Sequence, residues 1–250
     1  MNKFIRLPTH ILRDKCIFDI IRNLRKGRFL EIGPGIGETT AIFLKRQFVG
    51  VCYDLSPESR VVLREKMTKY SNELEIIDTL SNLKPDSFDY LFSFDVLEHI
   101  LDDSQALNKW MTYLKRDGWL LVSMPAHSKI YGISDKLMGH IKRYEKKELF
   151  NLLKSAGCKD IKIFNYGFPL INLTVRCINL IYQIFGKSCK EYDSLALEEK
   201  SMLSGTKSPN IATTLSFLFN ELCLMPFIMF QRFFYDKDYG PGYVAYGKKA

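Results

Sequence analysis

Residues 30–40 read LEIGPGIGETT, and this stretch decides the fold of the chain. Leu30 and Ile32 alternate as in a buried strand, whereas apolar side chains recur at helical spacing after Thr39. A glycine-rich segment separates the two patterns. The order is therefore strand, tight loop and helix, and it predicts that a nucleoside cofactor binds at the loop.

Glycines stand at alternate positions of this loop, at Gly33, Gly35 and Gly37. A glycine adopts positive φ readily and has no Cβ, so the backbone can approach a ligand closely where the helix begins. The dinucleotide fingerprint would need a further glycine at the position of Glu38. We therefore expect a nucleoside cofactor other than a nicotinamide dinucleotide.

An acidic residue follows the next strand. Residues 48–53 form an apolar, β-rich run that stops at Asp54, nineteen positions after Gly35. A carboxylate about 20 residues beyond such a loop can accept hydrogen bonds from both ribose hydroxyls. The alternative is that Asp54 caps the helix that starts near Pro57, although Ser56 is the better candidate for that cap.

Strand and helix patterns alternate through the first 165 residues, which predicts an α/β fold with a largely parallel sheet and helices on both faces. In such a sheet, ligands bind beyond the carboxyl ends of the strands. The predicted helices cover residues 9–24, 38–46, 57–70, 103–115 and 145–156, and the predicted strands cover 28–32, 48–53, 73–77, 88–94, 118–124, 160–165 and, at the end of the chain, 242–247.

Composition is that of a compact cytoplasmic enzyme. The 250 residues are 46% hydrophobic and 26% charged, which suffices for one sizeable core. The first fifteen residues lack the continuous apolar run of a signal peptide. The six cysteines are scattered without a C-x-x-C pair, so we expect reduced thiols and neither a disulfide framework nor a metal site.

The net charge of +8 raises the question of nucleic-acid binding. Lysines and arginines are spread over residues 22–28, 142–147 and 248–249, without one long basic tract interleaved with aromatic residues. A solvated basic surface explains this distribution, so no nucleic-acid partner is predicted.

Three segments together resemble the class I S-adenosylmethionine-dependent methyltransferases. The glycine loop with Asp54 resembles the cofactor site of that family. Residues 87–100, SFDYLFSFDVLEHI, resemble its fourth strand and the following turn, and residues 114–125, LKRDGWLLVSMP, resemble the turn and fifth strand. Asp117-Gly118 stands where Gly-Gly is commoner and still supplies a turn. The resemblance covers roughly residues 25–165.

The resemblance implies a Rossmann-like sheet of seven strands and S-adenosyl-L-methionine as the cofactor, with no metal. Base-modifying members carry an Asn/Asp-Pro-Pro-aromatic loop where this chain has Asp95-Val96-Leu97-Glu98, which disfavours base methylation. Asp78 and Thr79 stand where the family commonly holds adenine. The implied cofactor-binding residues are Glu31, Gly33, Gly35, Gly37, Asp54, Leu55, Asp78, Thr79, Asp95, Val96 and His99.

Residues 125–144, PAHSKIYGISDKLMGHIKRY, resemble a region of small-molecule methyltransferases that include quinone-biosynthesis-like enzymes. The resemblance implies that His127, Asp135, His140, Arg143 and Tyr144 form the acceptor side of the pocket. His127, His140 and Tyr144 are the candidate catalytic residues, and His99 is a further candidate base. A base is needed when the acceptor is a hydroxyl. The alternative is that these side chains brace the loop.

Residues 166–241 interrupt the fold before its last strand, so we expect one domain from residues 1–165 plus 242–250 and an apolar helical insert between them. Two apolar stretches, 168–185 and 211–235, lie inside the insert. Residues 211–230 carry one charge, Glu221, and Pro226 would interrupt a membrane-spanning helix there. The alternatives are helices that cap an apolar cavity, a membrane-surface contact, a true span, or a core or dimer face.

These features predict methyl transfer from S-adenosylmethionine to a small, apolar or lipid-linked acceptor, most readily at oxygen. One alternative is a module that keeps the cofactor pocket without catalysis. Another is a methyltransferase that acts on nucleic acid or protein. The predicted location is the cytoplasm, with membrane contact through the insert, and the sequence leaves the oligomeric state open.

Overall fold

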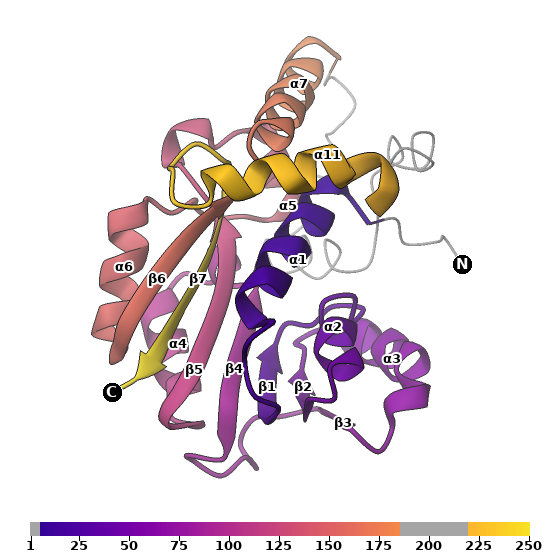
Figure 1. Ribbon diagram of the computed structural model, residues 1–250, viewed down its shortest axis with the longest axis vertical. Helices are drawn as coiled ribbons and strands as arrows, with labels where there is room; N and C mark the ends of the chain where they lie inside the picture. The colour runs from indigo at the N-terminus through magenta and orange to yellow at the C-terminus, as the bar shows by residue number, and fades with distance from the viewer. Residues whose placement is uncertain (1–5, 186–219) are drawn as a thin grey trace.

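The computed structural model describes residues 6–185 and 220–250 and contains one seven-stranded sheet. The strand order is β3-β2-β1-β4-β5-β7-β6 (Figure 1). This arrangement confirms the predicted Rossmann-like methyltransferase sheet. The strands are β1 (Arg28–Ile32), β2 (Val49–Tyr53), β3 (Leu74–Ile77), β4 (Phe88–Phe94), β5 (Leu114–Pro125), β6 (Cys158–Tyr166) and β7 (Gly242–Lys249).

The last strand lies inside the sheet. β1 to β5 pair in parallel, whereas β7 runs antiparallel between β5 and β6. Val122 pairs with Ala245 on one side of β7, and Ile163 pairs with Ala245 on the other. The prediction that residues 242–247 complete the sheet is confirmed, and the strand extends to Lys249.

Helices cover both faces of the sheet, as alternating strands and helices require. One apolar core joins α1, α2, α3 and α11 to one face, and a second joins α4 and α6 to the other. The helices are α1 (Pro8–Ile21), α2 (Thr40–Lys45), α3 (Pro57–Lys66), α4 (Asp103–Met111), α5 (Ile133–Met138), α6 (Lys146–Ser155), α7 (Leu170–Phe185) and α11 (Glu221–Gln231).

Aromatic side chains fill the core beneath α2. Phe29 of β1 and Phe92 of β4 are fully buried on the same face of the sheet. The ring of Phe43 from α2 stacks on Phe92 with centroids 4.0 Å apart. Because side chains alternate along a strand, Leu30 enters the opposite core. This packing fixes α2, and with it the loop that precedes α2, against the centre of the sheet.

Four predicted boundaries were wrong by three or more residues. Helix α1 ends at Ile21 instead of 24, and α3 ends at Lys66 instead of 70. The other two boundaries adjoin β5. Helix α4 ends at Met111, although the prediction continued it to residue 115. Strand β5 starts at Leu114, whereas the turn residues Asp117-Gly118 predicted a start at 118. The strand continues through these residues because the β4–β5 register shifts there and Asp117 takes a φ of 59°. The turn signal therefore marks an irregularity inside the strand.

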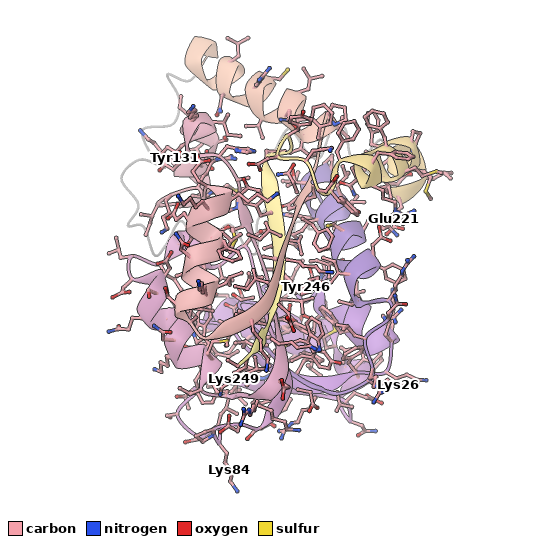
Figure 2. The ribbon with its side chains drawn as sticks, turned by 60° about the vertical axis from the view of Figure 1, so that its left-hand side comes forward. Lys26, Lys84, Tyr131, Glu221, Tyr246 and Lys249 are labelled. Atoms are coloured by element: carbon pink, nitrogen blue, oxygen red, sulfur yellow. The ribbon has the colours of Figure 1, made fainter. Side chains whose placement is uncertain are left out.

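Helices α5, α7 and α11 gather at the end of the sheet to which the parallel strands run (Figure 1). Figure 2 shows Tyr131 and Glu221 at this end, far from Lys84 and Lys249 at the other. Gln231 of α11 donates to the Leu12 carbonyl of α1 at 3.1 Å, and Ser134 of α5 donates its backbone N–H to Asn179 of α7 at 3.1 Å. These bonds hold α11 and α7 over the site end.

The predicted insert lies partly in the described residues. Helix α7 covers much of the first apolar stretch and α11 part of the second, while residues 186–219 lie outside the description. Within the described ranges, no helix is both long and apolar enough to cross a membrane. The division into a domain and an insert stays a prediction.

Candidate cofactor and acceptor site

The glycine loop has the backbone that the sequence predicts. Gly33, Gly35 and Gly37 have φ values of 70°, 55° and 81°. A Cβ on Gly33 would lie 2.4 Å from Val96 Cγ2, and one on Gly37 would lie 2.4 Å from Leu63 Cδ1. Positive φ and close neighbours therefore both select glycine, and the loop can follow a ligand closely.

Asp54 is fixed beside this loop. Its carboxylate accepts hydrogen bonds from the backbone N–H of Gly35 and of Ser56, each at 2.9 Å. The cap of α3 is Ser56, whose hydroxyl accepts from the Ser59 N–H at 3.1 Å. The alternative that Asp54 is the helix cap is therefore wrong. Burial raises the pKa of Asp54, and the backbone donors oppose that shift.

A cavity of about 290 Å³ opens at the carboxyl ends of the strands. It brings together five of the predicted cofactor residues, namely Glu31, Gly33, Gly35, Asp95 and His99. Residues from α1, α5 and α7 form the other walls. The cavity thus joins the glycine loop to the segment that the resemblance assigns to the acceptor.

Six predicted cofactor residues lie outside the lining of this cavity. Gly37 faces Leu63, and Val96 packs against Gly33. Asp54 and the 65% exposed Leu55 also lie outside the lining. Asp78 and Thr79 line a second hollow, where Arg60 Nε lies 2.8 Å from the Asp78 carboxylate. The assignment of the adenine to Asp78 and Thr79 stays a prediction.

Glu31 is the buried acid of the cavity wall. Its carboxylate accepts from the hydroxyl of Thr40 at 2.7 Å, and its side chain is 1% exposed. Burial raises the pKa of Glu31 to about 7, although Thr40 and the charge of Arg13 lower it. The cofactor carries an α-ammonium group, which a carboxylate at this wall can hold.

Sequence reasoning missed a buried ionic network from α1. The guanidinium of Arg13 donates to Asp95, to Asp14 at 3.0 Å and to the hydroxyl of Thr39 at 2.7 Å. Ser123 also donates to Asp95 at 2.7 Å. Burial alone would raise the pKa of Asp95, but Arg13 and Ser123 outweigh it and hold that pKa below its usual value. Arg13-Asp14 looks like an ordinary charged pair in the sequence, so nothing marks it as buried.

Of the three candidate catalytic residues, His140 lines the cavity. Its Nδ1 lies 2.8 Å from the carboxylate of Asp135, which also accepts from Arg143 Nε at 2.8 Å. Arg143 in turn donates to the carbonyl of Ala126 at 3.1 Å. Asp135 and Arg143 therefore orient His140 and brace the loop at the same time.

His127 and Tyr144 lie outside the cavity lining. Tyr144 is fully buried, and its hydroxyl donates to Asp103 at 2.6 Å. The ring of His127 packs edge-on against Tyr243, with Nε2 3.7 Å from a carboxylate oxygen of Asp238. The structure thus does not bring these two side chains into the cavity lining, where His140 lies.

Glu98 and His99 follow β4 at the same cavity wall. His99 Nδ1 lies 3.0 Å from the carbonyl of Gly139, and burial with the neighbouring His140 lowers the pKa of His99 to about 4. Glu98 is 0% exposed, and burial together with the charge of Asp95 raises its pKa well above the usual value. Glu98 belongs to the motif at residues 87–100, but the resemblance gave it no role.

Comparison with known proteins identifies the family. A model described as a methyltransferase domain matches residues 9–163. Among curated protein sequences, none matches the chain significantly. Because this family model matches more than half of the chain, the protein belongs to the methyltransferase domain family. The glycine loop and Asp54 fit its cofactor, so it is a class I methyltransferase that uses S-adenosyl-L-methionine.

Solved structures share the fold at low identity. Phosphoethanolamine N-methyltransferase 2 of Haemonchus contortus, in complex with S-adenosyl-L-methionine, has a TM-score of 0.58 at 21% identity over 95% of this chain and 52% of that one. The YcgJ protein of Bacillus subtilis has 0.58 at 15% identity over 95% and 98%. The CurJ carbon methyltransferase has 0.51 at 16% identity over 62% and 50%. The quinone-biosynthesis-like branch stays a prediction.

The contact between Asp54 and the loop generates a first prediction. Replacing Asp54 with Ala should weaken S-adenosylmethionine binding by about 1–3 kcal/mol, because a charged hydrogen-bond acceptor is lost. Isothermal titration calorimetry measures this, and NADH should not bind to either protein. Asp160→Ala, which removes an exposed carboxylate near Lys248, is the matched control. Equal affinity in the two variants would remove Asp54 from the site.

The position of Glu31 generates a prediction about pH. Its pKa of about 7 means that much of the free protein carries a neutral Glu31 below neutrality. Because the cofactor ammonium favours the ionised form, affinity should rise between pH 5.5 and 7 and level off above, with uptake of the cofactor releasing a proton. Calorimetry in buffers of different ionisation enthalpy counts that proton. A Glu31→Gln variant that keeps the same pH profile would contradict the assignment.

Proposed function

We propose that this methyltransferase acts on a hydroxyl oxygen of a small acceptor that is apolar or lipid-linked. The cofactor supplies an activated sulfonium methyl group, so the protein has to position the acceptor and exclude water. One observation carries the proposal: the cavity that the glycine loop lines is also lined by His140 and by apolar residues of α7. This continuity supports a single cavity that would take both the cofactor and the acceptor.

The walls of the cavity favour an apolar acceptor. Ile171 and Val175 stand one helical turn apart on α7 and both line the cavity, as do Leu7 and Met138. Ile171 is also part of the core that joins α11 to the sheet. These side chains offer the acceptor apolar contacts and keep water from the methyl group.

The orientation of His140 favours oxygen as the methylated atom. Asp135 accepts the Nδ1 hydrogen at 2.8 Å, so a neutral His140 keeps an electron pair on Nε2. A hydroxyl must give up its proton as it is methylated, whereas a neutral amine can attack without a base. A histidine held in this way can accept the hydroxyl proton during O-methylation. The N- and C-methyltransferases of the same fold show that fold alone does not choose the atom.

A second part of the proposal concerns the outer surface of α7, of α11 and of the 3-10 helix Arg232–Phe234 that follows α11. Leu173, Leu222, Phe230 and Phe233 are 63%, 81%, 45% and 76% exposed. A cluster of exposed apolar side chains of this kind marks an interaction surface, and a membrane surface is one that it suits. The inner side of α7 lines the cavity through Ile171 and Val175, so a lipid-linked acceptor could pass from the membrane to the site.

Loss of the His140 imidazole should reduce turnover while cofactor binding stays intact. We expect His140→Ala to lose about 10²- to 10⁴-fold in the rate of S-adenosylhomocysteine formation. The assay uses cell lipid extract as the source of acceptor and identifies the methylated product by mass spectrometry. His127→Ala, a histidine outside the cavity, is the matched control. Methylation at nitrogen or carbon, or full activity of His140→Ala, would contradict the proposal.

Liposome flotation tests the membrane part. The double variant Leu222→Ser and Phe233→Ser should lose most of its binding to anionic vesicles, because two exposed apolar anchors are removed. Val61→Ser is the control, since Val61 is 53% exposed on α3, away from α11. The membrane part would be contradicted if the unmodified protein bound no vesicles and was still fully active on a hydrophobic acceptor. In that case, α7 and α11 would act only as a cap.

A further inference from the structure

Two histidines and one glutamate meet at one wall of the main cavity. One ring nitrogen each of His99 and His140 and one carboxylate oxygen of Glu98 lie within 4.8 Å of one another. Glu98 and His99 come from the turn after β4, whereas His140 follows α5. His140 Nε2 is 4.0 Å from Glu98 Oε1. Because the two segments are distant in the sequence, their spacing shows no metal-binding pattern.

Both imidazoles are fixed through Nδ1. The carbonyl of Gly139 can only accept, so His99 Nδ1 donates to it at 3.0 Å. His140 Nδ1 donates in the same way to Asp135 at 2.8 Å. A neutral ring held like this has its electron pair on Nε2. A carbonyl or carboxylate behind the ring is the usual support of a histidine that binds a metal ion.

The carboxylate of Glu98 lacks a partner. The side chain is 0% exposed, and neither oxygen has a hydrogen-bond partner in the described part of the chain. The basic group that faces it is His140 Nε2 at 4.0 Å, beyond hydrogen-bond distance. The guanidinium of Arg13 bonds to Asp95, and that of Arg143 bonds to Asp135. A buried carboxylate without a donor is costly, and a cation bound beside it would compensate its charge.

We propose that Glu98, His99 and His140 bind a divalent transition-metal ion, with Mn²⁺ and Zn²⁺ as representatives. A divalent cation would satisfy these three electron-pair donors at once. Two imidazoles and one carboxylate suit first-row transition metals better than Mg²⁺ or Ca²⁺. Such ligands lie about 2.1 Å from the metal and about 3.0–3.4 Å from one another. The donor atoms, which are up to 4.8 Å apart here, therefore have to close by less than about 2 Å.

Three protein ligands leave coordination positions open to the cavity. The hydroxyl oxygen of the acceptor can occupy one of them, where the cation lowers its pKa and its proton leaves to water. The oxygen then forms its bond to the methyl carbon as the carbon–sulfur bond breaks. This step rests on the proposed O-methylation, and in it His140 acts on the hydroxyl through the cation. The cation site itself is independent of the acceptor.

Titration of the full-length, chelator-treated protein with Mn²⁺ tests the site, with free Mn²⁺ followed by electron paramagnetic resonance. We expect one ion per chain, and an affinity at least about 100-fold lower in Glu98→Gln, because loss of a ligand should cost no less than loss of a supporting residue. His127→Ala is the matched control and should bind as the unmodified protein does. Circular dichroism and cofactor titration verify that Glu98→Gln is folded.

The outcomes separate the two proposals. Absence of stoichiometric Mn²⁺ and Zn²⁺ binding, or equal affinity in Glu98→Gln, overturns the cation site. Binding that disappears in Glu98→Gln supports the site, and recovery of chelator-suppressed methylation by Mn²⁺ supports its part in the reaction. An enzyme that binds the ion but methylates nitrogen or carbon upholds the site and overturns the proposed O-methylation.

Discussion

The site depends on the hydrogen bonds and ion pairs that the buried guanidinium of Arg13 makes. The guanidinium joins α1 to the end of β4 through Asp95 and to the start of α2 through Thr39. Asp14 completes the pairing from the same helix. A buried charge is tolerated when such partners surround it, and removal of one partner leaves the others uncompensated. The positions of α1, the glycine loop and the β4 turn are therefore set together.

Asp95 shows how this pairing shapes the cavity. It has a φ of 56°, an unusual value for a residue with a side chain, and Arg13 and Ser123 hold its carboxylate. The chain turns sharply there, and Glu98 and His99 follow within one short 3-10 helix, Leu97–His99. Charge compensation at Asp95 thus places the next two polar side chains at the cavity wall.

Sequence patterns predicted what depends on neighbouring residues. Apolar alternation and glycine spacing predicted the strands, the loop at Gly35 and the acid at Asp54, because each is a local property of the backbone. The burial of Arg13 could not be predicted, since its partners come from β4 and α2. His127 and Tyr144 were predicted beside His140, yet the Tyr144 N–H pairs with the Pro125 carbonyl at 3.0 Å and turns that ring into the core. The intervening loop carries Asp135 and His140 over the cavity instead.

The place of β7 between β5 and β6 governs the order in which the sheet can be completed during synthesis. β6 is translated long before β7 but has no sheet partner until β7 arrives, because β7 separates it from β5. Until then, the nascent chain carries an open edge on β5 and an unpaired β6. The apolar helices α7 and α11 are also made in this interval. The nascent chain therefore exposes apolar helices and unpaired strand edges at the same time, and the sheet closes only when the last strand has been made.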